Sequence, residues 1–285
     1  MSYERLDIYE FGTHLLTKNE LDPVYVALTS NAHWSDSQLR RWLVAYWCFY
    51  NCGFASYASE FEGDDFWRLL AIAAENTTPA PTGDRWPRGR ERRHFRGQQG
   101  IKAIAELAKQ YEKKPEAMVD YITAGAPVYT AVAGRVKEHR GFGDWISFKV
   151  CDMTDRVMKI HVDFTEAAVF MFKDPVKAAL MFWRDTQKLP ENAKPKDQTW
   201  VIHKVVETLS DHFSEFLAPP FYDRPVGLQE IETILCCWKS HMNGHYPLFN
   251  DIREIREGIA PWIQYSCAAE DFLKAMPPGE EDEDV

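Results

Sequence analysis

Two glycines separated by one apolar residue mark the part of the sequence best suited to bind an anion. They lie in the segment His139-Arg-Gly-Phe-Gly-Asp-Trp-Ile-Ser-Phe-Lys149, between two helical patterns. We expect a tight turn at Gly141 and Gly143, with Phe142 directed into the core. The helix after the turn would begin with unpaired backbone N–H groups, which bind anions such as phosphate. An ordinary turn between two helices is the alternative interpretation.

An aspartate follows this turn at a spacing that resembles a known enzyme family. Asp163 ends the run Ile160-His-Val-Asp163, twenty residues after Gly143. In the helix-hairpin-helix DNA glycosylases, such a hairpin is followed by one helix, a short extended link and a catalytic aspartate in a Val-Asp pair. The resemblance covers residues 36–185 and implies that the hairpin binds DNA and that Asp163 is catalytic. Asp163 could instead cap a helix that starts at Phe164.

Two departures narrow the chemistry that this resemblance implies. Trp145 stands two positions after the second hairpin glycine, where lyase-type members carry a Schiff-base lysine. The cysteine cluster that holds an iron–sulfur centre in several members is absent too, and the six cysteines of this chain are expected to be structural. We therefore expect no β-lyase activity. Lys149, further along the same helix, is expected to contact DNA.

The second candidate site is a loop rich in arginine, residues 83–97. Pro87, Gly89 and Gly97 exclude a continuous helix there. Arginine binds phosphate oxygens bidentately, and the absence of lysine from the loop favours such geometric recognition over general charge. A solvated basic loop that balances the acidic C-terminal tail is the alternative. The expected phosphate ligands are Arg85, Arg88, Arg92, Arg93 and Arg96.

Four segments spread along the chain carry a likeness to one narrower family: Tyr46–Glu60, residues 83–97, Lys137–Trp145 and Leu228–Gly244. In these the sequence resembles the bacteriophage amino acid:DNA transferases, also called alpha-glutamyl/putrescinyl thymine pyrophosphorylases. The resemblance implies hypermodification of thymine. A hydroxymethyluracil in double-stranded DNA, already converted to a pyrophosphate ester, has its pyrophosphate replaced by the amine of an amino acid or polyamine. Double-stranded DNA and a small amine donor are thus the expected partners.

This reaction assigns roles to the candidate residues. The arginine loop would neutralise the departing pyrophosphate, with or without Mg²⁺ as a cofactor. Asp163, with Glu60 as a second candidate acid, would accept or orient the proton of the amine. A base extruded from the duplex would stack on Trp47, Trp86 or Trp145.

Glu230, Lys239 and His241 form a further polar set in the C-terminal third. His241 and His245 are four residues apart, but no third ligand is apparent, so no metal site is expected. Two other functions stay open at this point. One is a monofunctional DNA glycosylase, in which Asp163 would stabilise the sugar cation or activate water. The other is a non-catalytic DNA-binding protein that uses the hairpin and the arginine loop alone.

Charge and hydropathy limit the class of protein. A net charge of −10 argues against a protein that coats nucleic acid, because phosphate binding needs positive potential, which here is local to the arginine loop. The chain starts with no secretion signal and holds no run of 18 apolar residues, so we expect a cytoplasmic protein with no membrane partner, in the host cytoplasm if it is viral.

Helical periodicity dominates, and the expected class is an all-α, helix-hairpin-helix DNA-glycosylase-like helical fold with extra C-terminal helices. The expected division is an N-terminal helical extension (1–35), a glycosylase-like region with the arginine loop and hairpin (36–187), C-terminal helices packed on the same body (188–276) and a disordered acidic tail (277–285). The main helices are expected at 36–59, 64–76, 98–113, 115–124, 127–140, 144–157, 174–186, 199–217, 226–243 and 250–276.

Overall fold

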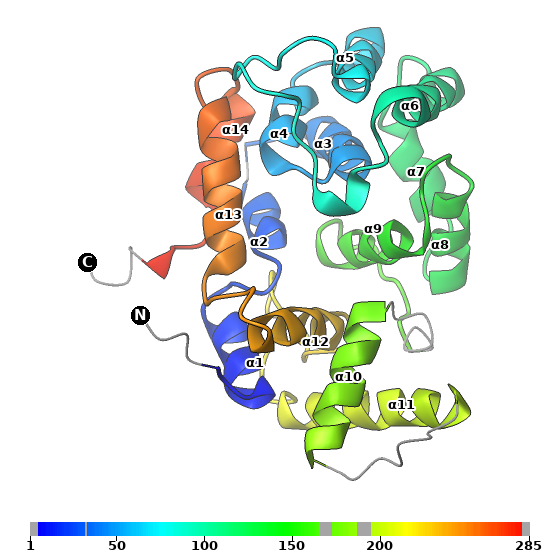
Figure 1. Ribbon diagram of the computed structural model, residues 1–285. Coiled ribbons are helices and arrows are strands. Elements are labelled where there is room, and N and C mark those ends of the chain that lie inside the picture. Colours follow the sequence, from blue (N-terminus) through cyan, green and yellow to red (C-terminus); the bar gives the residue numbers. More distant parts are fainter. Residues whose placement is uncertain (1–4, 32, 166–172, 187–194, 281–285) are drawn as a thin grey trace. The chain divides into compact units, whose positions relative to one another are not determined.

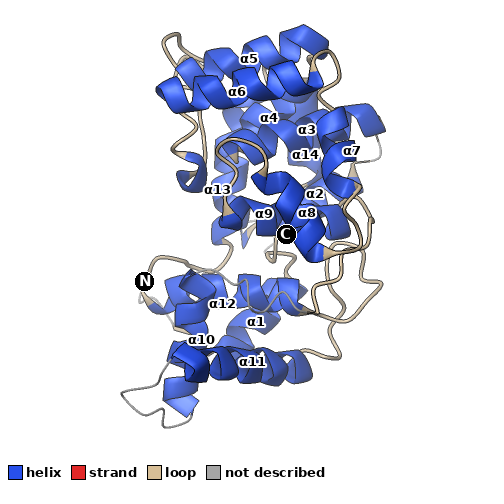
Figure 2. Cartoon of the chain, turned by 90° about the vertical axis from the view of Figure 1, so that its right-hand side faces the viewer, coloured by secondary structure: helices blue, strands red, loops and turns tan. Residues whose placement is uncertain are grey.

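The computed structural model describes residues 5–31, 33–165, 173–186 and 195–280 of the chain. Every regular element in these ranges is a helix, and no strand occurs in them (Figure 2). The predicted all-α class is confirmed, whereas its likeness to the glycosylase fold stays a prediction. None of the helices described is long and apolar enough to cross a membrane.

The described residues form two compact units, each assembled from separate stretches of the chain. The first, here called the hairpin unit, comprises Ala27–Val162 and Arg253–Met276. The second, here called the α12 unit, comprises the described residues within Met1–Val26, Asp163–Ile252 and Pro277–Val285. These units follow other boundaries than the segments expected from the sequence, and residues 281–285 of the expected acidic tail lie outside the described residues.

The hairpin unit is built from short helices around an aromatic core. Ring stacking links chain segments far apart in sequence: Trp42 lies parallel to Phe272, with 5.5 Å between the ring centroids. Trp47, Phe54 and Phe148 are fully buried. Its α-helices, labelled in Figure 1, are α3 (Asp36–Phe49), α4 (Cys52–Ser59), α5 (Gly63–Glu75), α6 (Gly97–Tyr111), α7 (Ala117–Thr123), α8 (Tyr129–Lys137), α9 (Asp144–Arg156) and α14 (Cys267–Ala275). It also contains two 3-10 turns, η1 (Arg90–Arg92) and η3 (Ala260–Trp262).

The single helix expected over 36–59 is wrong, because the chain breaks between α3 and α4. Tyr50 takes a left-handed conformation with a φ of 51° and ends α3. The Asn51 side chain then accepts a hydrogen bond of 2.9 Å from Phe54 N and starts α4. A side chain in the left-handed region costs free energy that hydrophobic periodicity does not report, so the break was not visible in the pattern. The predicted cap at Ser35 is confirmed by its hydrogen bond from Gln38 N.

The long helix expected over 250–276 is also wrong. It consists of α13 (Asn250–Ile259), the 3-10 turn η3 and α14. Pro261 lies in η3 and cannot donate the backbone hydrogen bond that a continuing helix needs. Ser266 restarts the helix by accepting a hydrogen bond from Ala269 N. The other main helices are found within a few residues of their expected bounds.

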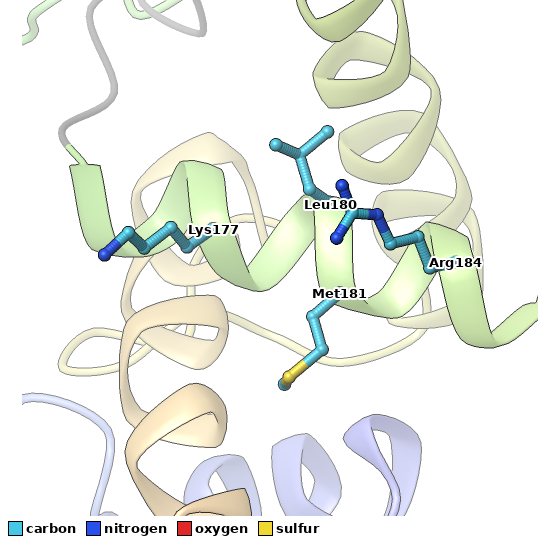
Figure 3. A pocket seen from close by; sticks show the side chains of 4 residues that line it. All are labelled: Lys177, Leu180, Met181 and Arg184. Atoms are coloured by element: carbon cyan, nitrogen blue, oxygen red, sulfur yellow. The ribbon is translucent and has the colours of Figure 1, made fainter. Parts of the chain in front are cut away.

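The α12 unit packs helices around a core of aliphatic and aromatic residues. Phe11, Leu209, Phe213 and Ile234 are fully buried in it. Its elements are α1 (Ile8–Thr17), α10 (Lys173–Thr186), α11 (Pro195–His212) and α12 (Leu228–Met242), while α2 (Pro23–Ser30) and α13 each contain a boundary between the units. On α10, Lys177, Leu180, Met181 and Arg184 line an open hollow of about 430 Å³ (Figure 3).

Candidate functional site

The hairpin joins α8 to α9 through two glycines with different requirements. Gly141 has a φ of 80°, and a Cβ there would lie 2.7 Å from Phe95 Cε2, so the fold itself demands glycine. Gly143, the N-cap of α9, has an ordinary φ of −103°, and a Cβ would meet nothing within 4 Å. α9 begins without a side-chain cap in the described part of the chain. Its first N–H groups are therefore without a side-chain acceptor, and the binding of an anion there stays a prediction.

Arg92 fastens the arginine loop to this hairpin. Its Nε–H donates to Cys48 O at 3.1 Å, and its Nη1 donates to Gly141 O at 2.8 Å. The guanidinium lies 4.2 Å from the Phe95 ring centroid and 4.7 Å from that of Phe142. The Arg92 side chain is 1% exposed, and burial lowers its pKa to about 10. Phe142 is buried, so the predicted plug of the turn is confirmed.

The reason for this burial lies at the C-terminus of α3. The last carbonyls of a helix lack hydrogen-bond donors within the helix. Here Gly89 N donates to Phe49 O at 2.8 Å, and the Arg92 side chain donates to Cys48 O. A cation at this end is also favoured by the helix dipole. The arginine loop thus caps α3 on one side and supports the hairpin on the other.

Arg88 has a second structural role in the loop. Its Nη1 donates to Phe95 O, and its Nη2 donates to Ala73 O at 2.8 Å. Burial, with a contribution from the charge of Arg96, lowers the pKa of Arg88 to about 10. Backbone carbonyls therefore accept two hydrogen bonds each from Arg88 and Arg92, two of the five predicted phosphate ligands.

The remaining predicted phosphate ligands are on the surface. Arg85, Arg93 and Arg96 are exposed, as are Arg90 and His94. His94 Nε2 lies 3.0 Å from Gly141 O, which places this exposed stretch directly beside the hairpin. The structure therefore brings together the two candidate sites that lie about fifty positions apart in the sequence, and it separates the arginines that build the loop from those that face solvent.

The three tryptophans predicted to stack on a base differ in accessibility. Trp47 is fully buried and its Nε1–H donates to Met153 Sδ at 3.3 Å. Trp86 is 4% exposed, and its Nε1–H donates to Thr78 O at 3.0 Å. Trp145 is partly exposed in the first turn of α9, with its ring 4.8 Å from that of Tyr50. Of the three, Trp145 is the ring that a base could reach without opening the core.

Glu60 and Lys149 occupy structural positions in the hairpin unit. Glu60 Oε1 accepts from Ser266 Oγ at 2.9 Å and from Ala268 N at 2.7 Å, so it caps α14. Lys149 is 8% exposed on α9. A lysine that contacts a DNA phosphate must reach solvent, and its burial does not favour the predicted DNA contact.

Asp163 is exposed, and its Oδ1 accepts a hydrogen bond of 2.9 Å from Thr165 N. This contact is the kind that a turn or cap provides. The helix expected to start at Phe164 falls largely on residues 166–172, which lie outside the described residues. Asp163 belongs to the α12 unit, and its catalytic role stays a prediction.

The polar set on α12 is satisfied by internal contacts. Glu230 is fully buried, accepts from Gly227 N at 2.8 Å and pairs with Arg224 at 3.0 Å. Lys239 pairs with the carboxylate of Asp174 at 3.0 Å. These contacts hold the start and the end of α12 to neighbouring segments, so neither residue needs a ligand to explain its position.

His241 is neutral and structural. Its Nδ1–H donates to Tyr246 O at 2.8 Å, and its Nε2 accepts from Leu6 N at 3.0 Å. Burial lowers its pKa. Among the described residues, no group of three histidine, cysteine or acidic side chains is arranged to hold a metal ion.

Sequence reasoning missed two features of the α12 unit. Lys177 and Arg184 place cations seven positions apart on α10 at the edges of its hollow, a spacing that was visible in the sequence. The buried Glu20, whose Oε2 accepts from Phe249 N at 2.7 Å, was invisible, because its partner comes from a separate segment.

Comparison with known proteins identifies the family. Residues 10–245 match the family model described as amino acid:DNA transferase. The chain belongs to the amino acid:DNA transferase family. Among relatives of this transferase, a glycinyltransferase of Pseudomonas phage PaMx11 is 50% identical over 97% of this chain and 98% of its own length. A putrescinyltransferase of Delftia phage PhiW-14 is 22% identical over 91% of this chain and 79% of its own.

Proposed function

We propose that this transferase replaces the pyrophosphate of a 5-pyrophosphorylated hydroxymethyluracil in DNA by the amine of an amino acid or polyamine. The observation that carries the proposal is the contact between the arginine loop and the hairpin through Arg92 and Gly141. It sets exposed arginines, which bind phosphate groups bidentately, next to a helix N-terminus suited to a DNA phosphate. The names of the two phage relatives, which transfer glycine and putrescine, support an amine as the second substrate.

The chemical step is a displacement at the CH₂ group on C5 of the base. The lone pair of the amine nitrogen forms the new C–N bond, and the C–O bond breaks with its electron pair moving to the pyrophosphate oxygen. The amine also loses one proton. Negative charge grows on the leaving group, and Arg85, Arg93 and Arg96 are the candidates that stabilise it. Arg88 and Arg92 act indirectly, because their hydrogen bonds hold the loop in shape.

Two further roles complete the proposal. Asp163 accepts or orients the amine proton. Trp145, beside the hairpin and partly exposed, stacks on the extruded base, which a duplex must release before chemistry at C5 can occur. Trp47 and Trp86 are instead buried in the hairpin unit.

The test is mass spectrometry of nucleosides after the protein has acted on duplex DNA that carries the pyrophosphorylated base. The donors are glycine, other amino acids and putrescine, with Mg²⁺ or EDTA in parallel reactions. We expect a nucleoside whose mass equals thymidine plus the donor minus two hydrogens, together with released pyrophosphate. Release of a free base would identify a glycosylase instead, and binding without any product would identify a DNA-binding protein.

A further inference from the structure

His94 is a titratable side chain at the point where the arginine loop meets the hairpin. It is exposed between Arg93 and Phe95, in the segment that connects η1 to α6. Its Nε2 lies 3.0 Å from Gly141 O. The same carbonyl oxygen accepts the hydrogen bond of Arg92 Nη1 at 2.8 Å. The roles proposed above for the arginine loop leave this imidazole without a function.

The contact with Gly141 fixes which ring nitrogen of His94 is available. A carbonyl oxygen only accepts hydrogen bonds, so Nε2 must carry the hydrogen and donate it. In the neutral ring, Nδ1 is then the nitrogen that carries the lone pair. Among the described residues, no side chain or backbone group forms a hydrogen bond with Nδ1. A nitrogen that can accept a proton is therefore available at the exposed surface of the loop.

Buried aromatic residues hold the ring of His94 in place although the ring itself is exposed. Phe95, which is 1% exposed, contacts this ring edge to face, with 5.6 Å between the centroids and 69° between the planes. Phe142 of the hairpin contacts Phe95 in turn, at a centroid distance of 5.8 Å. A side chain that is oriented before the substrate arrives can act on a bound amine without reorganisation.

The proposed displacement needs a group that removes a proton from the amine. When the amine nitrogen bonds to the CH₂ carbon it becomes positively charged, and it must release one proton to give the neutral product. Histidine is the side chain that most often accepts a proton in such steps. Arg93 directly precedes His94 and Arg96 follows it two positions later, so His94 lies among the arginines proposed to stabilise the leaving group.

We propose that His94 is the general base of the transfer, with Nδ1 as the atom that takes the proton from the amine. This assignment rests on the proposed function and deepens it. As the nitrogen lone pair forms the C–N bond and the C–O bond breaks towards the pyrophosphate, the electron pair of one N–H bond stays on nitrogen and its proton moves to Nδ1. The imidazolium keeps its Nε2–H bond to Gly141 O and then releases the proton to water. Asp163 has the orienting role alone.

The test compares His94→Gln with wild type in the transfer of glycine or putrescine to duplex DNA that carries the pyrophosphorylated base. Glutamine can still donate an amide N–H to Gly141 O, but its amide is not basic. We expect kcat to fall by about 100-fold or more, while the KM for the amine and the Kd for unmodified duplex DNA stay unchanged. The control is His33→Gln, an exposed histidine of the same unit outside the loop and the hairpin, which should turn over like wild type.

Chemical rescue separates a proton acceptor from a structural contact. Imidazole added to His94→Ala should restore part of the lost turnover, because the position is exposed and a free imidazole can reach it. The same addition should leave the rate of His33→Gln unchanged. Urea unfolding of His94→Gln should match wild type, since the substitution is on the surface and keeps a hydrogen-bond donor.

Three results would each overturn the base role. One is wild-type turnover in His94→Gln, which would leave the contact with Gly141 as the purpose of the ring. Another is a parallel loss of turnover and of affinity for unmodified DNA, which would make His94 a phosphate contact. The third is a His94→Ala variant that imidazole does not rescue. Failure of the proposed function has a different signature, because wild type itself would then form no product on activated DNA, and the base role would fall with it.

Discussion

Gly143→Ala is the sharpest test of the hairpin as a DNA contact. A Cβ at this position meets nothing within 4 Å, and the backbone is in a region that alanine adopts freely. Alanine is less favourable than glycine at an N-cap, but it lowers the entropy of the unfolded chain, and each effect is at most about 1 kcal/mol. The free energy of unfolding should therefore stay within about 1 kcal/mol of wild type.

DNA affinity should respond quite differently. If a phosphate oxygen approaches the N–H groups at the start of α9, the added methyl group blocks that approach. The loss of one hydrogen bond to a charged group costs about 1.5–3 kcal/mol, which corresponds to about a 10- to 100-fold weaker Kd. Gly134→Ala is the matched control, because Gly134 is exposed in α8 of the same hairpin and its Cβ is equally unobstructed.

The assay is fluorescence anisotropy with an unmodified duplex at several salt concentrations, beside urea unfolding of each variant. Gly134→Ala should be about 1 kcal/mol more stable and bind DNA like wild type. Equal DNA affinity for Gly143→Ala and Gly134→Ala would show that no ligand approaches the hairpin closely, and the turn would then be an ordinary connection between helices.

Four further outcomes are expected. Arg92→Met should lower the free energy of unfolding by about 2–4 kcal/mol, whereas Arg93→Ala should change it by about 0.5 kcal/mol or less. Arg93→Ala should instead lower turnover of activated DNA more than affinity for plain DNA. Equal stabilities of the two variants would contradict the structural role of Arg92. Asp163→Asn should lower kcat by about 100-fold or more with little change in stability, and near-normal turnover would remove its catalytic assignment. Trp145→Ala should weaken binding of DNA with a mismatched, easily extruded target base by about tenfold, as measured by anisotropy, and an unchanged Kd would exclude base stacking there. Folding raises the pKa of Asp251 to about 7, so the contribution of Asp251 to the free energy of unfolding is complete below pH 3.8 and is lost as the pH rises through 7. In urea unfolding, the stability of wild type should therefore decline over this pH window, and that of Asp251→Asn should not.

Local sequence signals predicted most of the elements correctly. Helices α5 and α9 follow from apolar spacing and from the glycines and prolines that bound them, both of which act over a few residues. The breaks at Tyr50 and Pro261 were missed for different reasons. Tyr50 adopts a left-handed conformation that the residue type does not announce, and Pro261 sits inside an otherwise continuous apolar pattern.

The sequence by itself determined the class of the fold, the family, the glycine turn and the concentration of arginine, because each depends on residue types within a short stretch or on likeness along the chain. Only the tertiary structure decided which arginines build the loop and which face solvent. Arg92 and Arg93 are adjacent residues of the same type, yet Arg92 donates a hydrogen bond to the C-terminus of α3 and Arg93 is exposed to solvent. The burial of Glu20 likewise depends on folding, since the backbone N–H of Phe249 that donates to its carboxylate lies 229 positions further along the chain. Burial and contacts between distant segments decide the charge state of a side chain and whether it can reach a ligand, and neither can be read from the spacing of residues in the sequence.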